Sequence, residues 1–107
     1  PVSKILRWDP TARKLSVFRE NSNLTNGLYF DPQGRLLCCE GGAGRVTRTD
    51  MKTGKIEVLA DKYNGFPFAA PNDLCLDGQG RVYTASIPMA KSRSFCIGRM
   101  STCPTAL

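Results

Sequence analysis

The sequence predicts an all-β protein that forms part of a β-propeller, with about two blades of four-stranded antiparallel sheet and an irregular C-terminal tail. Two observations predict this fold. A strand-turn-strand segment occurs twice, and short apolar runs alternate with turn residues along most of the chain. A third observation is that no stretch shows a sustained helical period. Four short strands in about 40–46 residues are typical of one propeller blade.

The repeat has two parts. Residues 26–36 (NGLYFDPQGRL) match residues 72–82 (NDLCLDGQGRV) at an offset of 46 residues. Residues 7–18 match residues 48–59 at an offset of 41, with Asp9 and Asp50 in equivalent places. A longer connection between an outer strand and the next inner strand explains the difference of five, because loops accept insertions more readily than strands.

Eight short apolar segments separated by turn sequences are expected to be strands. In chain order they are residues 3–8, 14–19, 27–30, 35–40, 45–49, 55–60, 73–76 and 81–84. Turns rich in Asp, Pro and Gly separate most of them, at residues 9–10, 31–34, 41–44, 53–54 and 77–80. These elements make up the outer hairpin of one blade, one complete blade and the beginning of a third. A small independent β-sandwich is the alternative fold.

Composition excludes several classes of function. The net charge of +6 comes from 15 basic and 9 acidic residues that are spread thinly, so we expect no nucleic-acid partner. No apolar run approaches the roughly 18 residues of a membrane helix, and no signal peptide is visible, so we expect a soluble chain without a membrane partner. The compartment stays open. The absence of histidine excludes a Ser-His-Asp triad within the chain.

Two local sequences could suggest metal or phosphate binding. Cys38 and Cys39 are adjacent, so in a strand they face opposite sides and make a poor chelating pair; we interpret them as small apolar residues. Residues 41–44 (GGAG) precede a strand rather than a helix, and no Gly-Lys-Ser/Thr follows. They are interpreted as a hairpin turn.

Several segments resemble the gluconolactonase branch of the SMP-30/gluconolactonase/LRE-like family. They are residues 25–28 (TNGL), 30–36 (FDPQGRL), 39–40 (CE), 45–48 (RVTR) and 70–74 (APNDL). The resemblance covers about residues 2–84, and its most specific motif is Pro-Asn-Asp. It implies a six-bladed propeller that hydrolyses sugar lactones around a divalent metal, most often Ca²⁺, in the central tunnel. Ala70 departs from the serine that is common at this place.

The resemblance implies that Asn72 is a metal ligand, and a neutral amide oxygen suits Ca²⁺. A strand-start asparagine that binds backbone groups is the alternative. Asp73, Asn26 and Glu40 are expected to bind substrate or to support the ligands. Their alternatives are a structural role for Asp73, turn formation for Asn26 and a solvated strand end for Glu40. The general base lies outside this chain, and Asp31 and other turn aspartates are expected to cap turns.

We divide the chain into a partial propeller, residues 1–84, and a tail, residues 85–107, that contains no acidic residue and alternates poorly. Read one base out of register, the codons from Ile87 onward permit Pro-Asp-Gly-Glu-Val-Thr-Lys-Leu. That sequence is similar to the hairpin at residues 53–58. Our hypothesis is that the tail arises from a frameshift near Thr84.

The resulting functional expectation is a fragment of a calcium-dependent lactone hydrolase. Metal-assisted attack of water would open a small-molecule lactone of a sugar acid. As an isolated fragment the chain is expected to be inactive, and its unpaired strand edges are expected to favour aggregation. The alternative is a non-enzymatic propeller repeat protein that serves as a protein-interaction module.

Overall fold

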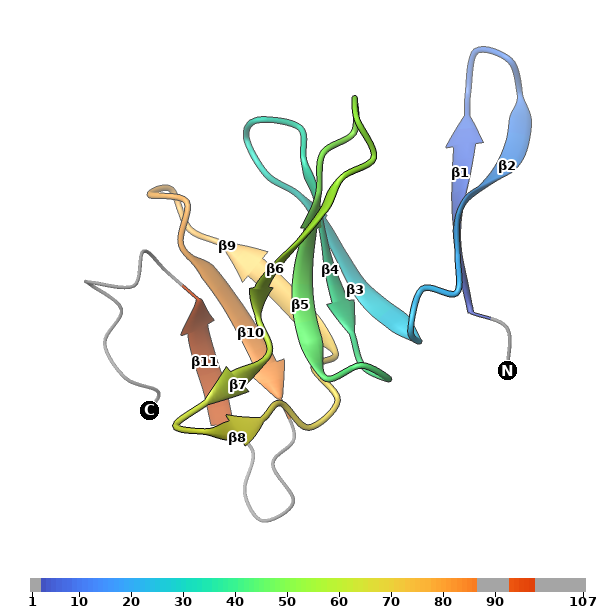
Figure 1. The fold of residues 1–107 in the computed structure, drawn as a ribbon. Coiled ribbons are helices and arrows are strands. Elements are labelled where there is room, and N and C mark those ends of the chain that lie inside the picture. The colour runs from blue at the N-terminus through green and yellow to red at the C-terminus, as the bar shows by residue number, and fades with distance from the viewer. Residues whose placement is uncertain (1–2, 87–92, 98–107) are drawn as a thin grey trace.

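The computed structural model describes residues 3–86 and 93–97, which form only β-strands and turns (Figure 1). In chain order the strands are β1 (Lys4–Asp9), β2 (Lys14–Glu20), β3 (Thr25–Phe30), β4 (Leu36–Glu40), β5 (Arg45–Thr49), β6 (Ile56–Ala60), β7 (Lys62–Tyr63), β8 (Phe66–Pro67), β9 (Asp73–Leu76), β10 (Val82–Ser86) and β11 (Arg93–Ile97). All pairings are antiparallel. The prediction of an all-β, partial propeller is confirmed.

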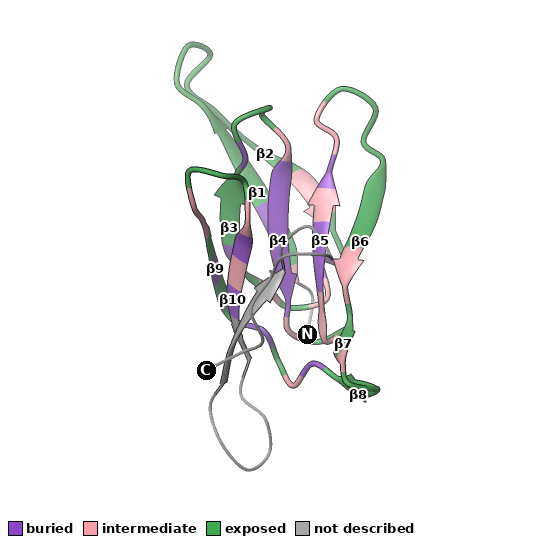
Figure 2. Cartoon of the chain, turned by 90° about the vertical axis from the view of Figure 1, so that its left-hand side faces the viewer, coloured by how far each residue is buried: buried purple, intermediate pink, exposed green. Residues whose placement is uncertain are grey.

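The sheets follow the chain in the order that the repeat predicts. β1 and β2 form a two-stranded hairpin, β3 to β6 form a four-stranded meander, and β9 and β10 begin a further sheet. Figure 2 shows the meander between the other two sheets, with β4 buried along its length and β6 mostly exposed. The chain therefore contains an outer hairpin, one complete blade and the inner strands of the next blade.

The turn aspartates show that the repeats are copies in three dimensions. In both inner turns the Oδ1 of Asp31 or Asp77 accepts bonds from the backbone amides two and four residues later, at 2.9–3.0 Å. In both outer turns Asp9 and Asp50 accept from the amides two and three residues later, at 2.8–3.0 Å. Desolvation raises the pKa of Asp77, but hydrogen bonds led by those from Arg81 outweigh it and lower the pKa to about 2. The expected turn-capping role is confirmed.

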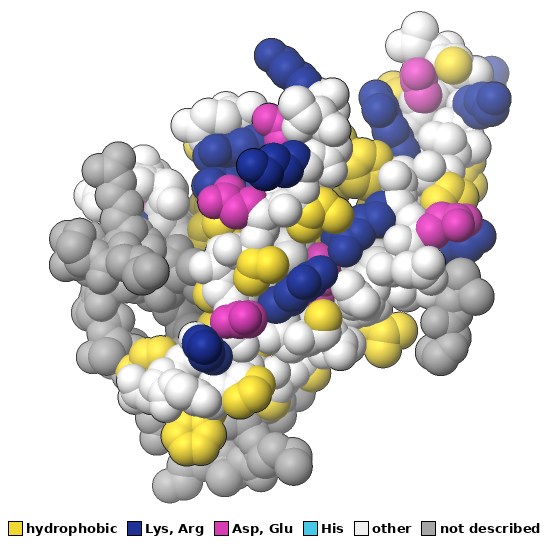
Figure 3. Space-filling model, in the orientation of Figure 1, with side chains coloured by type: hydrophobic (Ala, Val, Ile, Leu, Met, Phe, Trp, Pro, Cys, Tyr) yellow, Lys and Arg dark blue, Asp and Glu magenta, His cyan; other side chains and the backbone are white. Residues whose placement is uncertain are grey.

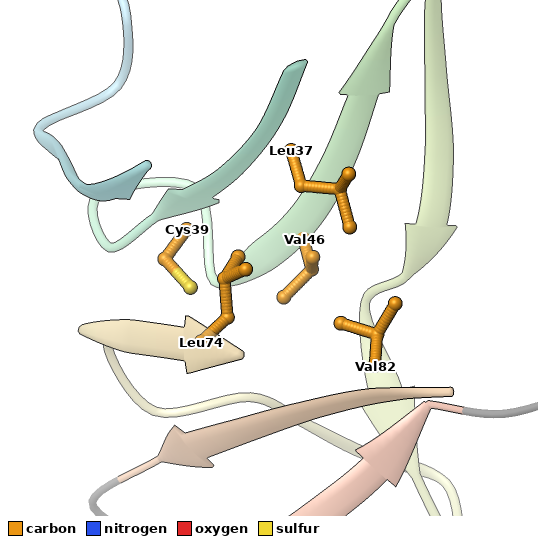
Figure 4. Packing of buried hydrophobic residues seen from close by; sticks show 5 residues of the cluster. All are labelled: Leu37, Cys39, Val46, Leu74 and Val82. Atoms are coloured by element: carbon orange, nitrogen blue, oxygen red, sulfur yellow. The ribbon is translucent and has the colours of Figure 1, made fainter. Parts of the chain in front are cut away.

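β4 is buried because it packs on both faces. Leu37 and Cys39 point to one side, where they meet Val46 of β5, Leu74 of β9 and Val82 of β10 (Figure 4). A second cluster uses the other face of the same strand and consists of Ile5, Leu36 and Cys38. The adjacent cysteines thus face opposite sides, as predicted, and burial raises the pKa of the Cys38 thiol to about 11. This two-sided packing is what a blade between two neighbours requires.

Two segments differ from the expectation. The longer connection before β9 contains a short hairpin, β7–β8, whose turn residues Asn64 and Gly65 both have positive φ; Asn-Gly favours this turn. In the tail, β10 continues past residue 84 to Ser86, and β11 pairs with it. The tail is therefore not irregular throughout. Residues 87–92 and 98–107 lie outside the described residues, and the frameshift hypothesis stays a prediction.

Candidate functional site

The structure brings Asn26 and Asn72 together at the border between two blades. Asn26 lies at the start of β3 and Asn72 directly before β9, so each stands at the entry of the innermost strand of its sheet. The Nδ2 of Asn26 donates a hydrogen bond of 3.0 Å to the Oδ1 of Asn72, and both residues are exposed. Two positions related by the 46-residue repeat thus meet side by side, as equivalent positions around a propeller axis should.

A glycine makes this close approach possible. A Cβ at Gly27 would lie 2.7 Å from the backbone oxygen of Asn72 and 2.7 Å from the Cα of Asp73. Real Cβ atoms do not approach backbone atoms so closely, so no larger residue fits between β3 and β9 without moving them. Gly27 is therefore part of the site, although the sequence alone had suggested only a strand residue there.

The turn before Asn72 is held by its own geometry. Ala70 has a φ of 46°, in the left-handed region that costs an L-residue roughly 1–2 kcal/mol. Pro71, which follows, is fully buried. A strained residue followed by a buried, rigid one fixes the direction in which Asn72 enters the strand, and such strain is common at functional sites.

Asp73 is exposed and is tied to its own strand. Its Oδ1 accepts the backbone amide of Leu74 at 2.8 Å, and its backbone carbonyl accepts the hydroxyl of Thr84 at 2.9 Å. Thr84 lies on β10 and also contacts the Sγ of Cys39 at 3.4 Å, across the blade border. The second carboxylate oxygen of Asp73 has no hydrogen bond among those that the structure shows.

Glu40 occupies a different environment from the one expected. Its side chain is 0% exposed, so it is not a solvated strand end. Each oxygen accepts two bonds, at 2.7–2.8 Å; the donors are Arg19, Asn23, Arg45 and Thr47. Burial raises the pKa of Glu40, but these four bonds outweigh it and hold the pKa below its usual value. With both oxygens occupied, Glu40 joins β2, β4 and β5, and it could influence a ligand only through the residues around it.

The oxygen donors at the blade border suit a hard cation but are few. Asn26, Asn72 and Asp73 offer amide and carboxylate oxygens, the ligand types that Ca²⁺ prefers. In residues 3–86 and 93–97 no three His, Cys, Asp or Glu side chains form a metal-binding group. Since Ca²⁺ takes about six to eight oxygens, these side chains fit part of a ligand set, and other blades would have to supply the remainder.

Sequence reasoning found some of these neighbours but not others. The pairing of Glu40 with Arg45 could be read from the predicted hairpin, since the two residues face each other across residues 41–44. Arg19 and Asn23 lie in or just after the preceding hairpin, and no sequence signal connects them with Glu40. The membrane expectation receives a limited check: across the described ranges, no helix has the length and hydrophobicity to span a bilayer.

Comparison with known proteins agrees with the fold and the repeat. The profile of the SMP-30/Gluconolactonase/LRE-like region matches residues 1–100, which extends beyond the resemblance at residues 2–84 into the tail. A gluconolactonase of Zymomonas mobilis is 32% identical over 101 residues, which is 82% of this chain and 28% of the relative. The Arabidopsis thaliana protein strictosidine synthase-like 7 is 27% identical over 86 residues, 79% of this chain and 22% of the relative.

Solved structures show the same fold. A gluconolactonase from Xanthomonas campestris superposes with a TM-score of 0.83 at 23% identity, over 95% of this chain and 39% of that chain. A second structure reported under the gluconolactonase name also gives 0.83, at 22% identity, over 95% and 40%. The chain thus spans well under half of each relative. With a family profile that matches residues 1–100, the chain belongs to the SMP-30/gluconolactonase/LRE-like family.

Proposed function

We propose that this chain is part of a lactone hydrolase and contributes Asn72 to a calcium centre near the propeller axis. The observation that carries the proposal is the hydrogen bond between Asn26 and Asn72, because it places two repeat-related amides together at the inner edge of adjacent blades. The family supports a lactonase-type reaction, and a gluconolactonase is among the relatives. The substrate class is a small-molecule lactone of a sugar acid.

In this proposal each side chain has a separate task. The Oδ1 of Asn72 faces the metal, and the amide of Asn26 orients it by donating the 3.0 Å bond. Asp73 supplies negative charge beside them through its carboxylate. A bound Ca²⁺ would polarise the lactone carbonyl and lower the pKa of an attacking water. This chain has no histidine and no assigned base, so we expect the isolated chain to be inactive.

The test uses the full-length protein encoded by the gene that contains this chain. Hydrolysis of δ-gluconolactone is followed by acid release, with Ca²⁺ added or removed by a chelator. We expect calcium-dependent turnover that falls at least tenfold in Asn72→Ala and less in Asn26→Ala. Gln79→Ala is the matched control, since it removes another exposed carboxamide at a strand turn and should leave turnover unchanged.

The opposite outcome would favour the alternative, a non-enzymatic propeller that presents a protein-binding face. No turnover of sugar lactones, together with no effect of calcium on either turnover or thermal stability, would refute the lactonase proposal. An Asn72→Ala variant as active as the unmodified protein would refute only the role of Asn72.

A further inference from the structure

The first hairpin has a free inner edge that its repeat equivalent does not have. β1–β2 corresponds to β5–β6 at the offset of 41 residues, and β5 pairs on its inner side with β4. Within the described residues β1 pairs only with β2. The edge of β1 that corresponds to the β4-bound edge of β5 is therefore available for one antiparallel strand.

An apolar groove of about 590 Å³ lies beside this edge, between the first hairpin and the complete blade. Its lining includes several large side chains that are about half exposed: Leu6 (54%), Trp8 (58%), Leu28 (45%) and Phe30 (57%). Figure 3 shows hydrophobic side chains where the hairpin meets the blade, whereas basic and acidic side chains are interspersed over the rest of this face. Such a concentration of exposed apolar area marks an interaction surface.

The same chain carries a strand that matches this edge. β10 is the equivalent of β4 at the offset of 46 residues, and β4 pairs with β5 in a defined register, with Cys38 opposite Thr47. Moving both strands of that pair by their offsets places Thr84 opposite Leu6 and Val82 opposite Trp8. Because the register comes from a pairing that the structure contains, it makes a specific statement about the occupant of the edge.

We propose that copies of this chain associate head to tail, with β10 of one copy paired to β1 of the next. β9–β10 of the first copy and β1–β2 of the second then form one four-stranded blade, and the inner strands fill the apolar groove. Each copy contributes two blade equivalents. Two copies would fall short of the length of the solved structures, of which one chain covers 40%, so a ring closes with about three copies.

The exchange replaces one strand by another. In the single chain, β11 pairs with residues 82–86 of β10, the same edge that β1 of a second copy would take. Because backbone hydrogen bonds are exchanged one for one, the net driving force is the burial of the groove side chains. A closed ring also removes the free strand edges that would otherwise favour open-ended aggregation.

Light scattering coupled to size exclusion tests the association. We expect a discrete mass near three chains for the unmodified protein and a single-chain mass for Leu6→Lys, which places a charge in the groove. Leu15→Lys is the matched control on β2, where the leucine is similarly exposed at 57% and lies outside the groove; it should associate normally. A single-chain mass at all concentrations, a continuous range of masses, or equal behaviour of the two variants overturns the proposal.

A cross-linking experiment tests the register without relying on a destabilising change. A photoreactive benzoylphenylalanine replaces Trp8, and light and heavy isotope-labelled chains are mixed before irradiation. We expect mixed light–heavy cross-links from position 8 to residues 82–86. The same photoreactive residue at Leu15 should not reach β10. Cross-links between copies that avoid β10, or cross-links only within one copy, overturn the proposed pairing.

Discussion

Glu40→Gln should destabilise the junction between the first hairpin and the complete blade. Glu40 accepts bonds from Arg19 and Asn23 on one side of this junction and from Arg45 and Thr47 on the other, all at 2.7–2.8 Å. Glutamine keeps the shape but turns one acceptor oxygen into a donor nitrogen. That nitrogen would face two hydrogen-bond donors, and two arginines would lose their counterion in a site that is 0% exposed.

The magnitude follows from burial. Removing one partner of a buried ion pair costs about 3–5 kcal/mol, because the remaining charge stays desolvated. The control is Glu57→Gln, which breaks the pair between Glu57 and Arg48 at 2.7 Å. Glu57 is 56% exposed, and exposed pairs contribute about 0–1 kcal/mol. We therefore expect the two substitutions to differ by at least about 2 kcal/mol, although the chemical change is the same.

Two measurements check this expectation. Urea unfolding, followed by the fluorescence of Trp8, the single tryptophan, gives the free energy of unfolding. Hydrogen exchange resolved by peptide should show faster exchange in residues 3–20 of Glu40→Gln, since Arg19 no longer anchors β2. If Glu40→Gln lost less than about 1 kcal/mol, or no more than Glu57→Gln, the view of Glu40 as a buried tie between blades would be refuted.

The pH dependence of the same pair of proteins gives an independent check. The folded-state pKa of Glu40 lies below its usual value. Its contribution to stability is therefore fully present above the unfolded-state pKa of about 4.3 and is lost as the pH falls through the folded-state value. The difference in stability between the unmodified protein and Glu40→Gln should shrink below about pH 4. A difference that stays constant to lower pH would contradict this assignment.

Three further outcomes are expected. Gly27→Ala should cost about 1–3 kcal/mol, because its Cβ would clash with the backbone before β9, whereas Gly78→Ala has open space and should be nearly neutral in the same unfolding assay. Arg13→Gly should raise the melting temperature by about 0.5–1 kcal/mol of stability, since Arg13 has a φ of 50° where its equivalent Gly54 has 75°; a lower melting temperature would contradict this. Raising the pH from 9 to 11 should cost up to roughly 3 kcal/mol through Cys38, whose folded-state pKa is about 11, and Cys38→Ala should show a shallower alkaline loss.

The repeat made the fold predictable. Because residues 26–36 and 72–82 share Asn, Asp, Gly and Arg at fixed places, they had to form the same turn, and Asp31 and Asp77 do bind the same backbone groups. Alternating apolar residues then placed every strand of the complete blade to within two residues. The adjacent cysteines were also predictable, since a strand must send Cys38 and Cys39 to opposite faces.

Contacts between blades were not predictable in the same way. The approach of Arg19 to Glu40 depends on how one hairpin packs beside the next blade, and no local pattern encodes that angle. The short hairpin β7–β8 was read as a loop because its two-residue strands are too short to show alternation. β11 has no repeat equivalent in the sequence, so only its pairing with β10 reveals it.

The bond between Asn26 and Asn72 also limits what a single copy of this chain can do. Repeat-related positions meet at the inner edge because adjacent blades are related by rotation about one axis, so each blade adds only a few oxygens to that centre. A cation that takes about six to eight oxygens therefore needs contributions from most of a ring. It follows that ring closure must precede any metal chemistry at Asn72, whether the missing blades come from a longer chain or from further copies of this one.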